Sequence, residues 1–296
     1  QMTLLQLYYF EALARILHFT KAAQELHIAQ PSLSYAMNEL EKELGVKLFD
    51  REKKHIELTS YGRIFLLYTQ KTLQTLEDGK RAVQSMKGEI RQSVRIGFFH
   101  SISSTLIPLI VEKFHKKQGN KDIHFQFEEG SSYHIYNEVK NREMDLGFCA
   151  HQGPEVGSCL VMRQPLYLMV SLEHPLAGKK YVKFEDFANE PMIALSKESN
   201  LRAKMDQMFS NHQTIPKIAC EVQECNAALR YVELNFGVAV LPEVPALHTA
   251  RVIILPIVDE NQEIVREIYL IWNLNRILPP AVETVRKFIV TNYTLK

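Results

Sequence analysis

The chain has 296 residues, of which 46% are hydrophobic and 23% are charged, a composition typical of globular proteins with two or three domains. No apolar run approaches the roughly 20 residues that span a bilayer, and the first residues lack a basic-then-apolar signal sequence. We therefore expect a cytoplasmic protein without a membrane partner. The net charge is only +1, so any contact with nucleic acid must depend on local charge.

Cysteines and histidines follow no pattern of a disulfide framework or a metal site. The four cysteines, Cys149, Cys159, Cys220 and Cys225, include no C-x-x-C pair, and we expect buried small side chains. A thiol sensor at Cys220 and Cys225 is the alternative. The eleven histidines are scattered without ligand spacing. No metal and no cofactor are predicted.

The first 44 residues predict three helices. Apolar residues at helical spacing predict a helix over 3–17 that supplies a core for the next two. A short helix over 20–26 follows, with Thr20 as its N-cap, then a turn over 27–30. The third helix is expected to open at Pro31, because proline suits a first helical position.

This third helix has an apolar and a polar face. Its apolar stripe consists of Leu33, Met37, Leu40 and Leu44. Its polar face carries side chains that can reach base edges, namely Ser32, Ser34, Tyr35 and Asn38. Two short helices with this division are typical of a helix-turn-helix. An ordinary helical hairpin has the same two-helix pattern and is the alternative at this point.

The segment after Gly45 favours the DNA-binding alternative. Two extended runs, 46–51 and 53–58, are expected to form a hairpin, or wing, around a basic tip. The tip consists of Arg51, Lys53, Lys54 and His55, and such a wing can contact phosphates or the minor groove.

Charge in this region is local rather than general. Residues 1–60 contain seven Lys and Arg against eight Asp and Glu, and five of the seven bases lie between Lys42 and Lys54. We expect the acids at positions 39, 41 and 43 to point away from DNA.

A long helix is predicted from Ser60 to about Gly88, where no proline occurs. A heptad pattern is met by Leu66, Leu73, Leu76, Val83 and Ile90. An exposed apolar stripe of this kind must be buried against another surface, and we expect that surface to belong to a partner chain.

From residue 93 onward, strands and helices alternate. We predict strands over 94–99, 123–127, 144–149, 167–172, 192–195, 217–222, 238–241, 252–258 and 267–272. We predict helices over 104–117, 133–141, 184–189, 201–210, 226–236 and 280–291, with Gly237 closing the helix before it in the left-handed conformation. This alternation is typical of a mostly parallel sheet with crossover helices. Two α/β lobes in tandem are also the organisation of bacterial solute-binding proteins.

Several motifs carry a family resemblance. They are Phe19-Thr20-x-Ala22-Ala23-x-x-Leu26, Gln30-Pro31-x-Leu33-Ser34, Leu40-Glu41-x-x-Leu44-Gly45-x-x-Leu48-Phe49-x-Arg51 and Leu58-Thr59-x-x-Gly62. This run resembles the LysR-type transcriptional regulators. The resemblance continues more loosely in Leu106-x-Pro108, Asp145-Leu146, His174-Pro175-Leu176 and Gly237-Val238-Ala239-Val240-Leu241-Pro242. The stretches 130–133 and 141–145 loosely resemble the regulators of glutamate synthase operons in Gram-positive bacteria.

The resemblance implies an α/β protein with an N-terminal all-α winged helix-turn-helix, a long linker helix and two lobes of periplasmic-binding-protein type. The implied domains are 1–60 for DNA binding, 61–90 for dimerisation and 91–296 for effector binding, the last with lobe 1 at 91–163 and 267–296 and lobe 2 at 164–266. Implied partners are double-stranded DNA, a second copy in a homodimer or homotetramer, a small metabolite and, as a further candidate, RNA polymerase. The predicted DNA-binding residues are Thr20, Lys21, Gln30, Pro31, Ser32, Ser34, Tyr35, Asn38, Arg51, Lys53 and Lys54.

The effector site is predicted at the carboxyl ends of strands, where loops lead into helix N-termini. The predicted effector-binding residues are His100, Ser101, Ser103, Ser104, Ser131, Ala150, Ser196, Ser199, Asn200, Glu224 and Cys225. Unpaired N–H groups and serine hydroxyls there suit a small organic anion, although the serines can also simply cap their helices. Glu224 would repel an anion, so an effector that also carries an amine is a further possibility.

An enzyme with a winged targeting domain is the competing class. The sequence contains no G-x-S-x-G, no H-E-x-x-H, no Walker loop and no dinucleotide glycine fingerprint. We therefore predict a transcriptional regulator and not an enzyme.

Overall fold

The computed structural model describes residues 1–51, 55–86, 92–150, 152–248, 251–260 and 262–295. The predicted DNA contacts Lys53 and Lys54, and the predicted helix end at Gly88, lie outside these residues. The chain divides into two compact units, Gln1–Met86 and Lys87–Lys296. No helix in the part of the chain that is described has the length and apolarity needed to cross a membrane.

Unit 1 contains the three expected helices, a hairpin and the long helix. The helices are α1 (Leu4–Ile16), α2 (Phe19–Glu25), α3 (Gln30–Leu44) and α4 (Ser60–Met86), and the antiparallel hairpin consists of β1 (Phe49–Asp50) and β2 (Glu57–Leu58). The apolar stripe of α3 is confirmed, because Leu33, Met37 and Leu40 are fully buried. They pack with Phe10 of α1 and Phe49 of the wing in one core.

The ends of these helices differ from the prediction at two places. Thr20 does not cap α2, because the helix begins one residue earlier and the ring nitrogen Nδ1 of His18 accepts a hydrogen bond from the Lys21 N–H at 3.4 Å. Likewise α3 begins at Gln30, with Pro31 in its first turn. Gly45 does end α3, and its φ of +69° is a conformation that glycine adopts without steric cost.

The long helix α4 has two different apolar faces, so the predicted single stripe was wrong. One face packs on α1. The rings of Phe65 and Phe10 lie 5.2 Å apart, and the Tyr8 hydroxyl donates to a Glu77 carboxylate oxygen at 3.2 Å. Leu73 shares this face and is buried, at 8% exposure. A heptad pattern marks the apolar positions, but it does not distinguish a helix face that packs on another helix of the same chain from a face that stays exposed to solvent.

Unit 2 is built on a seven-stranded sheet of order β10–β6–β11–β5–β3–β4, with β9 also paired to β6. The strands are β3 (Ser93–Phe98), β4 (His124–Glu129), β5 (Leu146–Cys149), β6 (Val156–Ser171), β9 (Ala239–Pro242), β10 (Val252–Pro256) and β11 (Val265–Asn273). A second, two-stranded parallel sheet pairs β7 (Pro191–Leu195) with β8 (Lys217–Val222). The helices are α5 (Leu106–His115), α6 (Ser132–Lys140), α7 (Phe184–Phe187), α8 (Asn200–Asn211), α9 (Cys225–Glu233) and α10 (Pro280–Tyr293).

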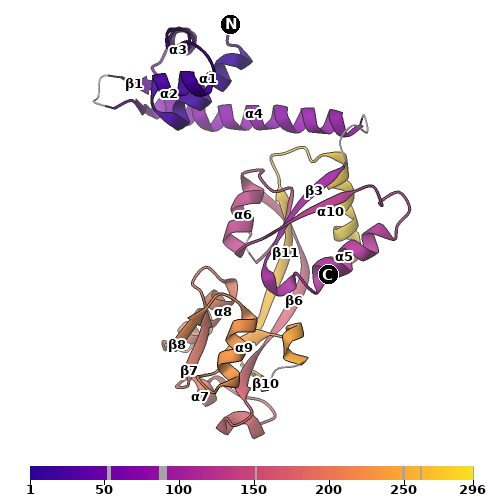
Figure 1. Ribbon diagram of the computed structural model, residues 1–296. Coiled ribbons are helices and arrows are strands. Elements are labelled where there is room, and N and C mark those ends of the chain that lie inside the picture. Colours follow the sequence, from indigo (N-terminus) through magenta and orange to yellow (C-terminus); the bar gives the residue numbers. More distant parts are fainter. Residues whose placement is uncertain (52–54, 87–91, 151, 249–250, 261, 296) are drawn as a thin grey trace. The chain divides into compact units, whose positions relative to one another are not determined.

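The sheet is mixed rather than mostly parallel. Strand β3 is parallel to both β4 and β5, as expected for crossover helices. Strands β6 and β11, however, pair antiparallel along nine residues of β11 and run side by side through both lobes (Figure 1). Only the last five residues of β6, from Tyr167 to Ser171, were predicted as strand, and the first eleven, from Val156 to Leu166, were missed.

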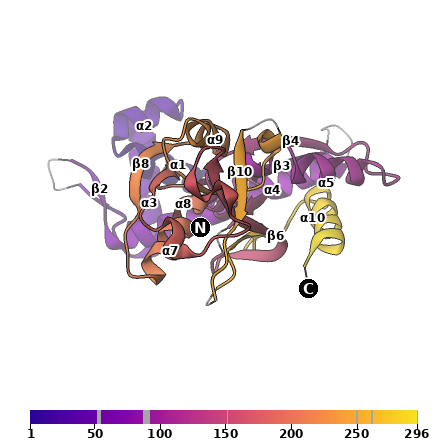
Figure 2. The same ribbon diagram turned by 90° about the horizontal axis from the view of Figure 1, so that it is seen from below.

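Each lobe has its own core. In the first, α5 and α10 lie side by side (Figure 1 and Figure 2), with the rings of Phe114 and Phe288 5.2 Å apart. In the second, α8 and α9 cover the strands around a core that includes Phe187 and Phe209. Gly237 does not take the left-handed conformation. Asn235 does, with φ of +58°, while a side chain on Gly237 would meet the Pro191 carbonyl oxygen at 2.4 Å.

Asp145 is the centre of a buried ion cluster between β3 and β5. Its carboxylate accepts hydrogen bonds from Arg95 at 3.0 Å and from Arg276 at 2.8 Å. Burial disfavours the charged carboxylate, but the hydrogen bond and charge of Arg95 and the charge of Arg276 outweigh it and hold the pKa of Asp145 below its ordinary value. The cluster fixes the start of β5 against β3.

Candidate DNA-binding surface and effector cavity

The polar face of α3 is open in unit 1. Gln30, Pro31, Ser32, Tyr35 and Asn38 are exposed and Ser34 is half-buried. Tyr35 has 68% of its surface exposed. Thr20 and Lys21 of α2 are also exposed. The structure therefore brings most of the predicted DNA-binding residues onto two neighbouring helices, with the exposed N-terminal half of α3 as their centre.

A buried glutamate that sequence reasoning missed attaches the wing to α3. Glu41, only 3% exposed, accepts hydrogen bonds from the backbone N–H groups of Leu48 at 2.8 Å and Phe49 at 3.2 Å. Its second oxygen pairs with Lys47 at 3.1 Å and Arg51 at 3.4 Å. We did not anticipate from the sequence that this acid is buried against the wing. Its spacing of four residues from Met37 already places it beside the apolar stripe.

Arg51 links the wing to α3. Its guanidinium donates to the Asn38 side-chain oxygen at 3.0 Å and lies 4.9 Å from the Phe19 ring. With 31% of its side chain exposed, Arg51 holds the Asn38 side chain and still faces solvent.

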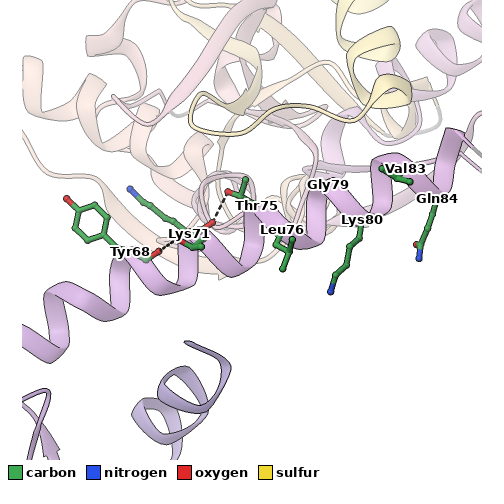
Figure 3. Close-up of a pocket in the computed structure, with 9 residues that line it drawn as sticks. Tyr68, Lys71, Thr75, Leu76, Gly79, Lys80, Val83 and Gln84 are labelled. Atoms are coloured by element: carbon green, nitrogen blue, oxygen red, sulfur yellow. Dashed lines mark hydrogen bonds between the residues drawn. The ribbon is translucent and has the colours of Figure 1, made fainter. Parts of the chain in front are cut away.

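A second surface feature is a groove of about 800 Å³ along the exposed face of α4. Figure 3 shows side chains such as Tyr68, Leu76 and Val83 projecting from the helix around Gly79. Tyr68 and Val83 are 66% and 58% exposed. Tyr61, Ile64 and Leu67 extend this apolar surface toward the start of the helix. An apolar surface of this length on a single helix is typical of an association site.

Unit 2 contains a cavity of about 310 Å³ where loops from both lobes meet. Its walls come from the segments that follow β3, β4, β7 and β8, each of which leads into a helix. Eight of the predicted effector residues line it, namely His100, Ser101, Ser131, Ser196, Ser199, Asn200, Glu224 and Cys225.

Three predicted residues do not line this cavity. The segment after β3 turns into a short 3₁₀ helix, His100–Ile102, and the Ser103 hydroxyl donates to the His100 carbonyl oxygen at 2.8 Å. Ser104 is exposed just before α5. The Ala150 N–H donates to the Ser132 hydroxyl at 3.2 Å. After β3, only Phe99, His100 and Ser101 line the cavity.

Two serines that line the cavity also cap helices. The Ser131 hydroxyl accepts from the His134 N–H at 3.2 Å and caps α6, and the Ser199 hydroxyl accepts from the Leu201 N–H at 3.2 Å and caps α8. Both serines therefore do cap their helices. Because a hydroxyl can donate while it accepts, capping leaves each serine a donor for a ligand.

The cavity contains a buried cation that sequence reasoning missed. Arg266 of β11 is 3% exposed, donates to the Ser101 hydroxyl at 2.7 Å and to the Gln164 side-chain oxygen at 3.1 Å, and stacks 4.6 Å from the Phe99 ring. All of these partners are neutral, and among the described residues no carboxylate pairs with it. Burial lowers the pKa of Arg266 to about 10, so the guanidinium stays charged at neutral pH. Its position in the strand could have indicated its burial, because Arg266 lies two and four residues before the buried Ile268 and Leu270 and so points to the same face of β11.

Acidic side chains line the same cavity as Arg266. His100 sits between two acids, with Nδ1 3.1 Å from Glu129 and Nε2 3.5 Å from Glu224. Cys225 lines the cavity as a buried thiol. Burial raises its pKa to about 11, against the charge of Arg266, which lowers it. A thiol so seldom ionised is a weak nucleophile, so the redox alternative gains no support here.

Comparisons with known proteins agree with this geometry. A model of the bacterial regulatory helix-turn-helix protein, LysR family, matches residues 4–63, and a model of the LysR substrate binding domain matches residues 87–293. The chain is 32% identical to an uncharacterized HTH-type transcriptional regulator, YybE of Bacillus subtilis, with 98% of each chain covered. It is 28% identical to the transcriptional dual regulator GltC of the same organism, over 98% of this chain and 97% of GltC.

Solved structures extend the likeness to the fold. The effector binding domain of QuiR in complex with shikimate matches with a TM-score of 0.65 and 28% identity, over 69% of this chain and 98% of that one. Full-length BenM matches with a TM-score of 0.59 and 26% identity, over 99% and 97%.

Proposed function

Because this chain belongs to the LysR family of transcriptional regulators, we propose that it binds promoter DNA through unit 1 and senses a small organic anion in the cavity of unit 2. The family consists of regulators and not of enzymes. The predicted class and fold, a winged helix-turn-helix followed by an effector-binding domain, are confirmed. The effector, the contact residues and the assembly are proposals.

The observation that carries the anion proposal is the uncompensated charge of Arg266. Taking a guanidinium out of water without a counter-charge costs several kcal/mol unless a partner replaces the lost solvation. The neutral partners Ser101 and Gln164 supply hydrogen bonds but no charge. A carboxylate in the cavity would complete the pairing and could accept two parallel hydrogen bonds. The QuiR relative, in complex with shikimate, supports small-molecule binding by such a domain.

We propose that DNA is contacted by the exposed residues of α2 and α3 named above and by the wing, with residues 1–60 as the DNA-binding domain. Residues 61–90 are the proposed dimerisation helix and 91–296 the effector-binding domain. Within that domain the chain passes from lobe 1 to lobe 2 between residues 163 and 164 and returns to lobe 1 between residues 266 and 267. The register supports this division, because Gln164 pairs with Arg266 on neighbouring strands. Such a regulator would act in the cytoplasm, where it meets DNA and RNA polymerase.

We propose further that two copies associate through the groove on α4. Its apolar rim, from Tyr61 to Val83, faces water in the single chain, and each 100 Å² removed from water contributes about 2.5 kcal/mol. A second α4 offers the same apolar surface, so a symmetric pair would cover both at once.

The experiment tests the charge requirement of the cavity. We would screen carboxylates of three to seven carbons, shikimate included, each beside its uncharged amide or methyl ester, by thermal shift and then by calorimetry. Carboxylates should stabilise the wild type. Arg266→Gln should weaken binding about 10- to 100-fold, as expected for loss of a charged hydrogen bond, with near-ultraviolet circular dichroism as the check of folding.

The matched control is Arg163→Gln on β6, where the arginine pairs with Glu263 and Glu267 outside the cavity. It should bind the carboxylates as the wild type does. Equal stabilisation by the uncharged analogues, or full binding by Arg266→Gln, would contradict the proposal.

A further inference from the structure

A group of metal-ligating side chains lies at the end of β4 and on α6. Glu128 is the penultimate residue of β4, while His134 and Glu138 are four residues apart on α6 and so share one face of the helix. One donor atom from each of the three lies within 4.8 Å of the other two. The Glu128 carboxylate oxygen and His134 Nε2 are 3.1 Å apart.

The charge around this group is strongly negative. A third acid, Glu143, lies near enough to Glu138 for their negative charges to repel each other. Three carboxylates around one imidazole are thus held at a distance where their charges repel, which a bound cation would reverse.

We propose that Glu128, His134 and Glu138 bind one divalent transition-metal ion of the Zn²⁺ type. An imidazole nitrogen with carboxylate oxygens suits Zn²⁺, whereas Mg²⁺ and Ca²⁺ prefer oxygen ligands alone. Metal–ligand bonds of about 2.0–2.1 Å in a tetrahedron place neighbouring ligands roughly 3.3 Å apart. The Glu128–His134 distance of 3.1 Å already matches this separation. The Glu138 donor atom lies within 4.8 Å of the other two and would have to come closer to complete the set.

The place of these ligands suggests what the ion would do. Between Glu128 and His134 lies the segment 129–132, which lines the effector cavity. An ion bound to both ends would tie β4 to α6 and hold this segment in one conformation. This consequence for ligand binding rests on the proposed function, but the metal site itself does not.

The test is a Zn²⁺ titration of the untagged full chain, after treatment with a chelator, in competition with a chromophoric chelator. The wild type should bind one ion per chain at this site, and Zn²⁺ should raise its melting temperature. His134→Gln and Glu138→Gln should each lower the Zn²⁺ affinity at least tenfold. Both residues lie near the surface, and equal metal-free melting temperatures would show that the variants fold.

The matched control is His124→Gln. His124 is an exposed histidine on the same strand and the same face as Glu128, but four residues away, a span of about 13 Å. It should leave the affinity unchanged. Co²⁺ in place of Zn²⁺ should give visible bands without a sulfur-to-cobalt charge-transfer band. Unchanged Zn²⁺ affinity in both α6 variants, or thiolate charge transfer, would overturn the proposal.

Discussion

Glu41 should be the residue on which the position of the wing depends most. Replacing it with alanine removes the acceptor of two backbone N–H groups, those of Leu48 and Phe49, which lie in a region where all three residues are buried. Each unsatisfied buried donor costs about 1–3 kcal/mol. The ion pairs add little, because Lys47 is 73% exposed. We therefore expect Glu41→Ala to destabilise the wing attachment by about 3–5 kcal/mol.

Glu41→Gln separates hydrogen bonding from charge. Its amide oxygen can still accept from Leu48 and Phe49, so we expect a loss of only about 1–2 kcal/mol. Because the two compact units would both contribute to a melting curve, amide hydrogen exchange is the sharper assay. The Leu48 and Phe49 amides should exchange about 100-fold faster or more in Glu41→Ala. Glu43→Ala, which alters an exposed acid on the same helix, is the control. Unchanged protection in Glu41→Ala would refute this reasoning.

Three further predictions concern unit 2 and the long helix. The pKa of Asp145 is lowered in the folded chain, so its stabilisation is complete above the pKa of an unfolded aspartate, near 3.9, and is lost as pH falls through the lower folded value. Asp145→Asn should therefore cost about 3–5 kcal/mol at neutral pH and flatten the acid limb of a pH–stability curve. Tyr68→Asp with Val83→Asp should shift the sedimenting species toward the monomer, whereas Gln70→Asp, on another face of α4, should not; a wild-type monomer at micromolar concentration would contradict the groove assignment. With a pKa of about 11, Cys225 should be alkylated by iodoacetamide far more slowly than an exposed cysteine at pH 7.5, and rapid labelling would revive the redox alternative.

Local patterns predicted the elements of unit 1 well because their causes are local. The stripe of Leu33, Met37 and Leu40 and the glycine at position 45 are read directly from helical spacing and from backbone conformation. Glu41 was missed because a charged residue near a helix end is usually solvated. Its burial depends on the two N–H groups that the later wing brings to it.

Other features depend on partners far away in the chain. The antiparallel pairing of β6 and β11 joins residues about one hundred positions apart, which strand periodicity alone does not indicate. The face of α4 that packs on α1 could not be told from the open face, and the heptad test therefore included Leu73. The donor group at His134 was missed because only the spacing of histidines and cysteines was considered, while its partners are glutamates on two elements.

Arg266 explains why the effector cavity could be located from sequence but its charge could not. Loops at the carboxyl ends of strands are found by their order along the chain, and eight predicted residues line the cavity for that reason. Arg266 instead lies near the start of β11, paired in register with Gln164, where the two long strands pass between the lobes. Its hydrogen bond to Ser101 joins that crossing to the loop after β3. A ligand anion held by this guanidinium would therefore contact β6 and β11, which among the described residues are the only strands that both lobes share. The serines that cap α6 and α8 would approach the anion from opposite lobes.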